Sequence, residues 1–257
     1  MIFCNLGSGS KGNCTYIQNN GKALLIDQGF SLKNLTSRMV EVNLSPADVS
    51  AIILTHEHSD HIKGAGIFAR RHKTPIYMTK KTFHAIDPKK LTNVKVEFFK
   101  SGDTLSLQNI KIKTFHLPHD AADPIGIVAS SGDKRLGIVT DLGTVTQSVL
   151  HYISDLDLLF LEANHDMFML LNGPYPLQVI QRIKSRVGHL SNEQSLDLFN
   201  RISRNGSLKY LVLGHLSETN NEAQIVRELF EKTKAENSIS YKIEIASQNS
   251  PGTVINI

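Results

Sequence analysis

Residues 52–61 of the chain read IILTHEHSDH, and this stretch decides the fold. Three histidines and one aspartate fall within its last six positions, directly after an apolar run that is typical of a buried strand. His56 and His58 are two residues apart and cannot share a helix face, so the stretch is not the helical H-E-x-x-H motif. In a turn after a strand, side chains two apart can converge on one metal ion while the adjacent Asp60 and His61 face a second. The stretch therefore predicts a metal site, for which imidazole suits zinc, iron or manganese and the carboxylate favours manganese.

The same pattern recurs along the chain, because apolar runs repeatedly end on polar side chains of the kind that bind metals. It is seen in RLGIVTDLG (135–143), LDLLFLEANHD (156–166) and KYLVLGHLS (209–217). Buried strands that deliver His and Asp to their carboxyl ends suggest a site at one edge of stacked sheets. We therefore expect a layered α/β fold with two sheets and outer helices.

Strand and helix signals alternate from end to end without a linker, which predicts a single domain over residues 1–257. Capping boxes at Ser191 with Gln194 and at Thr219 with Glu222 predict two helix starts. Apolar and β-branched runs predict strands at 24–27, 51–55, 75–78, 94–99, 110–115, 136–140, 156–161, 210–213 and 241–246.

Composition and charge set limits on the class of protein. The 257 residues are 40% hydrophobic and 20% charged, so neither disorder nor a coiled coil is expected. The chain does not begin like a signal peptide and has no apolar run of membrane-spanning length, so we expect a cytoplasmic protein without a membrane partner. The net charge of +4 permits an anionic partner. Local basic clusters, among them Arg182, Lys184 and Arg186, are by default solvated faces.

The segment Gly7 to Gly12 reads GSGSKG and matches the dinucleotide fingerprint G-x-G-x-x-G, with Asp27 at the distance of its ribose-binding acid. The fingerprint requires a helix after the third glycine, whereas residues 13–17 read as a strand. The glycines are better explained by the turn of a hairpin, so we expect no dinucleotide cofactor. Cys4 and Cys14 flank this loop and are expected to be reduced and buried.

The string THEHSDHIKG resembles the H-x-H-x-D-H signature of the metallo-β-lactamase fold superfamily. Four further stretches, LGSGSKGNCTYI, LPHDAADPIG, LEANHD with GPYP, and GHLSN, look like the YycJ/WalJ branch of bacterial metallohydrolases, and LGHLSETNN fits its last histidine motif. The resemblance extends from Leu6 to past Asn221. It implies a four-layer αββα sandwich with two mixed sheets, two divalent metal ions (Zn or Mn), and a DNA exonuclease.

The resemblance also implies roles for individual residues. His56 and His58 would bind the first metal with the histidine of the third motif, for which His116 and His119 compete. The His-Asp-Ala match favours His119. The second metal would be bound by Asp60, His61 and His215, and Asp141 would bridge both ions. His72, His84 and His151 stay unassigned and are expected to be exposed or locally hydrogen-bonded.

Two ions bridged by a carboxylate can hold a hydroxide between them as the nucleophile, so no serine or cysteine nucleophile is needed. Asp60 would orient that hydroxide. His165 and His189 are the two candidates for the acid that protonates the leaving group, and either could instead hold a loop by hydrogen bonds. The glycine loop would contact a substrate phosphodiester through Gly9, Ser10, Lys11 and Asn13, the alternative being a purely structural hairpin.

We therefore predict a two-metal phosphodiesterase, and the resemblance implies that it is a 5′-to-3′ DNA exonuclease connected with repair. One alternative keeps the metals but changes the substrate to a small ester, thioester, lactone or cyclic phosphodiester. Another is a metal-stabilised regulatory module without turnover, against which the full ligand set argues. The sequence makes no prediction of the oligomeric state.

Overall fold

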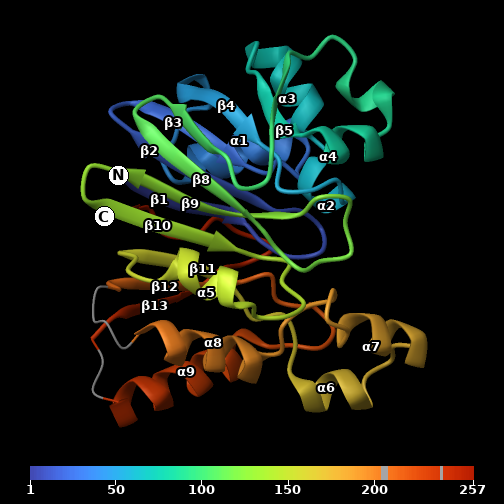
Figure 1. The fold of residues 1–257 in the computed structure, drawn as a ribbon, viewed down its shortest axis with the longest axis vertical. Coiled ribbons are helices and arrows are strands. Elements are labelled where there is room, and N and C mark those ends of the chain that lie inside the picture. Colours follow the sequence, from blue (N-terminus) through green and yellow to red (C-terminus); the bar gives the residue numbers. More distant parts are fainter. Residues whose placement is uncertain (204–207, 238–239) are drawn as a thin grey trace.

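Two seven-stranded sheets lie face to face in the computed structural model, which describes residues 1–203, 208–237 and 240–257 (Figure 1). The strand order is β14-β1-β2-β3-β4-β5-β6 in the first sheet and β13-β12-β11-β10-β9-β8-β7 in the second. Each sheet is mixed. In the first, β1 to β3 are antiparallel and β3 to β6 parallel, and in the second β7 to β10 are antiparallel and β10 to β13 parallel.

The first sheet is built from the amino-terminal half of the chain and receives one strand from the carboxyl terminus, where Ile2 pairs with Asn256. Its strands are β1 (Ile2–Gly7), β2 (Cys14–Asn19), β3 (Lys22–Ile26), β4 (Val49–Ile53), β5 (Ile76–Thr79), β6 (Val96–Phe99) and β14 (Ile255–Asn256). The second sheet contains β7 (Thr104–Leu107), β8 (Ile110–His116), β9 (Ile125–Ser131), β10 (Lys134–Val139), β11 (Leu158–Glu162), β12 (Tyr210–Gly214) and β13 (Lys242–Ile245).

Helices cover the outer face of each sheet, so the layers follow the order αββα (Figure 1). The helices near the first sheet are α1 (Leu32–Glu41), α2 (Ser59–Ile62), α3 (Ala65–His72) and α4 (Lys80–Ala85), with short 3-10 turns η1 (Pro46–Asp48) and η2 (Pro88–Leu91). Those near the second are α5 (Gln147–Ile153), α6 (Met167–Asn172), α7 (Leu177–Ile183), α8 (Asn192–Ile202) and α9 (Ala223–Asn237).

Three apolar clusters hold these layers together. The cluster between the sheets includes Phe3 and Phe160, whose ring centroids are 6.0 Å apart. The first sheet packs against α1 and α3, for example through Leu35 and Phe68, and the second packs against α5, α8 and α9. Because both faces of each sheet are covered, central strands such as β11 are buried along their whole length, and β11 is apolar up to its last residue, Glu162. The structure confirms the predicted four-layer αββα sandwich.

All nine predicted strands are present, with ends that shift by one or two residues. The hairpin of β1 and β2 around the glycine loop is also present. The strands β7, β9 and β14 were not predicted. Cys4 and Cys14 are buried free thiols, as expected. None of the described helices is long and apolar enough to cross a bilayer.

One predicted helix start is correct and the other is wrong. Ser191 and Gln194 form a reciprocal capping box at the start of α8. Thr219, in contrast, lies in a turn, and α9 begins only at Ala223. The reason is Asn221, which is buried and donates from Nδ2 to the carbonyl of Ala163 and to the side chain of Asn192, while its Oδ1 accepts from the backbone of Glu222. These contacts hold the backbone at Asn221 in a non-helical position, so the helix begins after it.

Candidate metal centre

The histidine-rich segment after β4 lies at an edge where strands of both sheets end. His56 and His58 follow β4, and His61 is on α2. From the second sheet, His119 comes from the loop between β8 and β9, Asp141 follows β10, and His215 follows β12. Parallel neighbours end at the same edge of a sheet, which is why residues far apart in sequence meet here.

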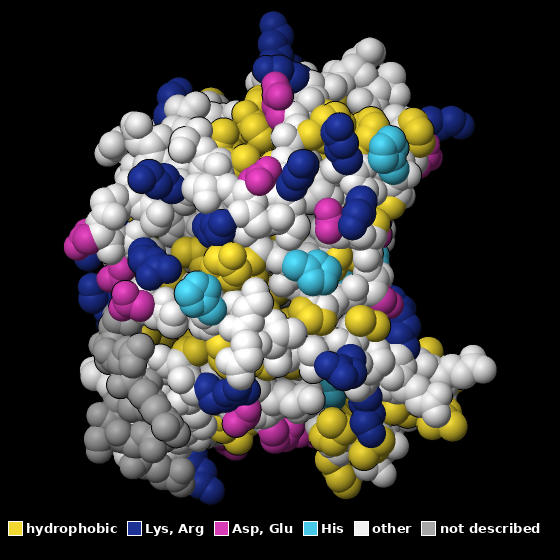
Figure 2. All heavy atoms as spheres, in the orientation of Figure 1, with side chains coloured by type: hydrophobic (Ala, Val, Ile, Leu, Met, Phe, Trp, Pro, Cys, Tyr) yellow, Lys and Arg dark blue, Asp and Glu magenta, His cyan; other side chains and the backbone are white. Residues whose placement is uncertain are grey.

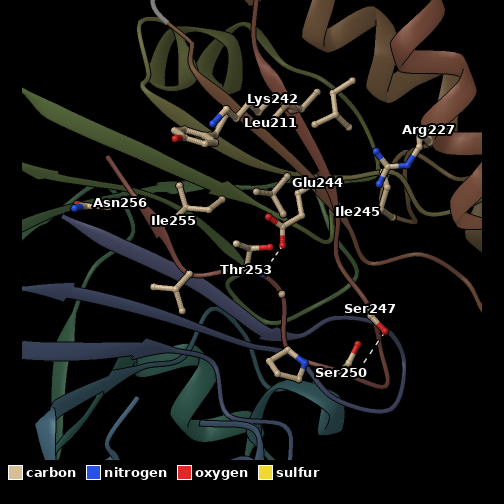
Figure 3. Close-up of a pocket in the computed structure, with 16 residues that line it drawn as sticks. Leu211, Arg227, Lys242, Glu244, Ile245, Ser247, Ser250, Thr253, Ile255 and Asn256 are labelled. Carbon is tan, nitrogen blue, oxygen red and sulfur yellow. Dashed lines mark hydrogen bonds between the residues drawn. The ribbon is translucent and has the colours of Figure 1, made fainter. Parts of the chain in front are cut away.

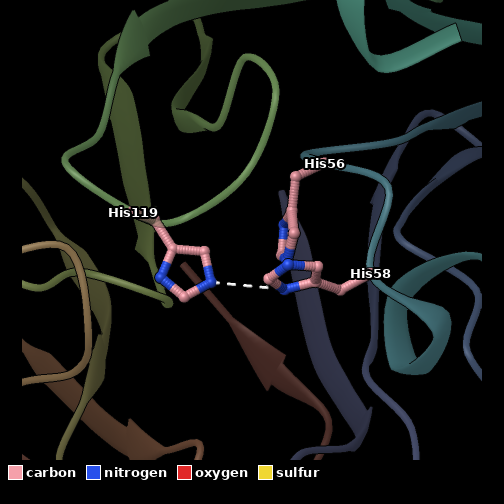
Figure 4. A group of neighbouring side chains, drawn as sticks. All are labelled: His56, His58 and His119. Atoms are coloured by element: carbon pink, nitrogen blue, oxygen red, sulfur yellow. Dashed lines mark hydrogen bonds between the residues drawn. The ribbon is translucent and has the colours of Figure 1, made fainter. Parts of the chain in front are cut away.

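One group of side chains consists of His56, His58 and His119 (Figure 4). One ring nitrogen of each lies within 4.8 Å of those of the others. His119 Nε2 and His58 Nδ1 are 3.3 Å apart, and the ring centroids of His56 and His58 are 4.5 Å apart. His116, the competing residue of the third motif, is exposed at the end of β8. The structure thus brings His119, and not His116, into this group.

A second group consists of Asp60, His61 and His215. His61 Nε2 lies 3.3 Å and His215 Nε2 3.9 Å from Asp60 Oδ2. Asp141 lies between the two groups, with Oδ2 3.3 Å from His61 Nε2 and Oδ1 3.5 Å from His215 Nε2 and 3.6 Å from His119 Nε2. It therefore contacts members of both groups, as a bridging carboxylate must.

The outward-facing nitrogen of every one of these histidines has a partner. His61 Nδ1 lies 2.8 Å from Asp27 Oδ2, and His215 Nδ1 lies 2.8 Å from Glu162 Oε2. The partners of His56 Nδ1, His58 Nε2 and His119 Nδ1 are the Thr55 hydroxyl, the Asp120 carbonyl and the Gly188 carbonyl, at 3.0, 3.2 and 3.1 Å. Metal-binding histidines typically have such a partner, which fixes the ring and its tautomer.

The inward-facing atoms, in contrast, include several without a partner. His56 Nε2, His215 Nε2 and Asp141 Oδ2 are buried and make no hydrogen bond within the described residues. Buried polar atoms of native proteins are normally satisfied, so these three point to a missing ligand. Imidazole nitrogens and carboxylate oxygens that converge in this way fit divalent metal ions.

Two buried carboxylates behind the ligands were not identified as site residues from the sequence. Glu162, at the end of β11, accepts from the backbone of Asp141 and Leu190 and contacts His189 Nδ1 and His215 Nδ1 at 2.9 and 2.8 Å. The signal for Glu162 was a charged residue at the end of an otherwise apolar strand. Asp27, assessed only as a ribose-binding acid, instead contacts His61 and accepts from both the backbone and the hydroxyl of Thr55.

Ion pairing dominates the electrostatics of the group. Burial opposes ionisation of Asp141, but His215 and His61 outweigh it and hold its pKa well below the usual range. Burial likewise opposes protonation of His215, yet Asp141, Asp60 and Glu162 together raise its pKa to about 10. The pKa of Glu162 is lowered to about 2, because His189 and His215 outweigh the cost of burial. The carboxylates are therefore charged at neutral pH, as metal binding requires.

The two predicted proton donors occupy different places. His189 lies beside the metal ligands, lines the pocket over them, and has a raised pKa because Glu162 outweighs the effect of burial. His165 is buried outside the lining of that pocket, and its burial lowers its pKa to about 4. The backbone of His165 also forms an isolated parallel β-bridge with Ser191, the N-cap residue of α8.

The glycine loop lies next to the metal ligands, but most of its backbone N–H groups already have acceptors. Gly9 N donates to Asn13 Oδ1, Lys11 N to Gln248 Oε1, and Asn13 N to the carbonyl of Asp60. Asn13 Nδ2 donates to Asp60 Oδ2 at 3.0 Å and lies 3.0 Å from His61 Nε2. Lys11 Nζ pairs with Glu218. Of the four predicted phosphate contacts, Ser10 is the one that lines the pocket.

The pocket over the ligands has a volume of about 260 Å³ and includes Asp60, His119, Asp141, His189 and His215 in its lining. A larger groove of about 740 Å³ lies along β13 and the carboxyl-terminal segment (Figure 3). The described residues that line that groove include no histidine, and its half-buried carboxylate, Glu244, accepts from the backbone of Thr253 at 2.7 Å. The smaller pocket is therefore the candidate site.

Comparisons with known proteins agree with this arrangement. The family described as a beta-lactamase superfamily domain matches residues 22–215. The exodeoxyribonuclease WalJ of Streptococcus pneumoniae is 38% identical over 220 residues, which cover 84% of this chain and 81% of the relative. The exodeoxyribonuclease YycJ of Bacillus anthracis is 36% identical over 231 residues, covering 88% and 86%. Among solved structures, the metallo-beta-lactamase fold protein YhfI of Bacillus subtilis superposes with a TM-score of 0.74 over 99% of both chains at 17% identity, which shows a shared fold.

Proposed function

The chain belongs to the beta-lactamase superfamily, and on that premise we propose that it is a metal-dependent phosphodiesterase that degrades DNA as a 5′-to-3′ exonuclease. The observation that carries the proposal is the convergence of five imidazoles and two carboxylates on one another, with buried unpartnered atoms among them and with five of these seven side chains lining one pocket. The two relatives named exodeoxyribonuclease support the choice of DNA as substrate.

We propose that the site holds two divalent ions, zinc or manganese. His56, His58 and His119 would hold one, Asp60, His61 and His215 the other, and Asp141 would contact both. Two separate groups of ligand atoms, with Asp141 between them, support this number. When bound, such ions supply Lewis acidity and lower the pKa of a water molecule.

The chain's own residues would orient the reactants. Asn13 Nδ2 donates to Asp60 Oδ2, so the Asp60 carboxylate is fixed in the lining of the pocket, where it can orient the attacking water. We propose His189 as the acid for the leaving oxygen, because it lines the pocket and Glu162 fixes its Nδ1. His165 would instead hold the segment before α8 in place through its backbone pairing with Ser191. Of the glycine loop, Ser10 remains as the substrate contact.

A time course on 5′-labelled and 3′-labelled DNA, single-stranded and duplex, tests the proposal. Protein supplied with manganese or zinc is expected to release mononucleotides from the 5′ end. EDTA and Asp60→Ala should each abolish release, whereas Asp87→Ala, a change at an exposed carboxylate that caps η2, should not. Intact DNA with metal-loaded protein would overturn the proposal and direct attention to small esters, thioesters or cyclic phosphodiesters.

The cellular setting follows from the proposed substrate. A DNA exonuclease of this kind would act in the cytoplasm, in DNA repair, and residues 1–257 would act as one domain. The names of the two bacterial relatives support the exodeoxyribonuclease activity on which this setting rests.

A further inference from the structure

A segment that we name the arm, residues 167–187, projects beside the candidate site and leaves its apolar side chains uncovered. It comprises α6, α7 and their connection (Figure 1). Only Leu170 of α6 is buried, and no residue of α7 is. Phe168 is 75% exposed, and Leu171, Leu177, Val179 and Val187 are also exposed. Figure 2 shows hydrophobic side chains gathered over α6 and α7, so the arm carries apolar surface that the fold does not use.

The arm is also cationic. Between Asp166 and Glu193 the sequence has no aspartate or glutamate, whereas Arg182, Lys184 and Arg186 lie in this interval and are exposed. Exposed apolar side chains and arginine also suit a protein partner, because protein interfaces are enriched in aromatic residues and arginine. The lack of acidic side chains in this interval favours nucleic acid instead, because single-stranded nucleic acid is bound by positive charge combined with exposed aromatic rings.

The arm is joined directly to the metal-binding loops. Tyr175, Arg182 and Ile183 line the pocket over the metal ligands. At the end of the arm, the Val187 carbonyl accepts from the backbone of Asp120 at 2.9 Å, and the neighbouring Gly188 carbonyl contacts His119 Nδ1 at 3.1 Å. A strand bound in the pocket therefore already touches the arm and can continue along it.

Resting on the proposed function, we propose that the arm binds an unpaired segment of the nucleic-acid substrate next to the phosphodiester that is cleaved. Bases stack on Phe168 and Tyr175, and phosphates contact Lys184 and Arg186. Stacking needs bases that are not paired in a duplex, so the arm favours single-stranded ends over blunt duplex ends. Arg182 is held by Asp120, with Nε 2.6 Å from Oδ2, and stays at the mouth of the pocket.

The chain contains no tryptophan, so a single Phe168→Trp variant reports on the arm alone. With metal-loaded protein and a phosphorothioate single strand that resists cleavage, its fluorescence is expected to be quenched on binding, with an affinity equal to or higher than that of the native protein. Phe98→Trp is the matched control, because Phe98 is 47% exposed and lies on β6, outside the arm and the lining of the candidate site. Its fluorescence should not change.

Alanine substitutions test the same surface through the affinity of the protein for single-stranded DNA. Phe168→Ala should weaken binding of the single strand roughly fivefold or more, which is the typical loss for one stacked base. Lys184→Ala with Arg186→Ala should reduce the salt dependence of binding by about 1.4 in log–log slope, at about 0.7 per phosphate contact. Phe98→Ala and Lys89→Ala with Lys90→Ala are the matched controls and should leave affinity and slope unchanged.

The outcomes separate the inference from the proposed function. Hydrolysis of bis(p-nitrophenyl) phosphate and of DNA by the native protein tests the proposed function alone. If neither compound is hydrolysed, the proposed function is wrong. Tight DNA binding with unquenched Phe168→Trp and unchanged affinity of Phe168→Ala overturns the arm as a DNA site. If sedimentation shows that Phe168→Ala converts a dimer to a monomer while DNA affinity is unchanged, the arm is an interface between copies of the chain, and the inference is wrong.

Discussion

Replacing Glu162 by glutamine tests how far the residues behind the metal ligands control metal binding. The Glu162 carboxylate is fully buried and surrounded by donors. Oε2 accepts from the backbone of Asp141 and faces His189 Nδ1 and His215 Nδ1, and Oε1 accepts from the backbone of Leu190 at 2.9 Å. Glutamine keeps the shape, but it removes the charge and turns one acceptor into a donor.

Either orientation of the new amide disturbs the site. With its NH₂ group in place of Oε2, His215 can keep a hydrogen bond only by accepting at Nδ1, so its proton moves to Nε2, the nitrogen that faces the metal group. With the NH₂ in place of Oε1, the backbone N–H of Leu190 loses its acceptor, which costs about 1–3 kcal/mol. Changes behind metal ligands typically lower metal affinity by about 10- to 100-fold, equivalent to roughly 1.4–2.7 kcal/mol.

The assay is competition for the metal with a chromophoric chelator, combined with thermal unfolding of the metal-free protein. Glu244→Gln is the control, because the half-buried Glu244 carboxylate likewise accepts from a backbone N–H, but it lines the groove along β13. We expect weaker binding for Glu162→Gln and native affinity for Glu244→Gln. If Glu162→Gln binds the metal within twofold of the native affinity, the assigned role of Glu162 is wrong.

Two further predictions concern the surroundings of the site. A Cβ on Gly29 would clash with the carbonyl oxygen of Asp60, so Gly29→Ala should displace the segment around Asp60, lower metal affinity and destabilise the fold by about 1–3 kcal/mol, measured by chelator competition and denaturant unfolding. At Gly21, where a Cβ meets nothing within 4 Å but φ is +74°, alanine should cost only local strain and leave metal affinity unchanged. Burial raises the pKa of Cys4 to about 12 and that of Cys14 well above its usual value, so neither thiol should react with Ellman's reagent at pH 8 until the protein is unfolded. A fast-reacting thiol in the native protein would contradict this.

Much of the fold could be predicted because its signals are local. Covered strands are apolar along their length, and the abrupt change to His or Asp at the end of β4, β10 and β12 marks both the strand end and the site. Thr219 shows the limit of the approach. The sequence around it satisfies a capping box, but the buried Asn221 decides where α9 begins.

The residues behind the ligands could not be identified in this way, because their partners are distant in sequence. Asp27 and His61 are 34 positions apart, and Glu162 and His215 are 53 apart. No spacing rule links such pairs. The same holds for the glycine loop, whose N–H groups looked available for phosphate. Gln248, 237 positions from Lys11, occupies one of them, and the Asp60 carbonyl occupies another.

Three residues of the site have left-handed backbones, with φ of 60° at Asp27, 60° at Asp141 and 55° at His215. Each directly follows a strand or lies just beyond it, and such a conformation costs on the order of 1–3 kcal/mol for a residue other than glycine. A specific acceptor holds each backbone N–H, namely the Ile53 carbonyl, the Glu162 carboxylate and the Ser8 hydroxyl. These hydrogen bonds stabilise the left-handed backbone conformations and direct the side chains of these residues toward one another. Loss of a supporting residue such as Glu162 should therefore lower both the metal affinity and the stability of the fold.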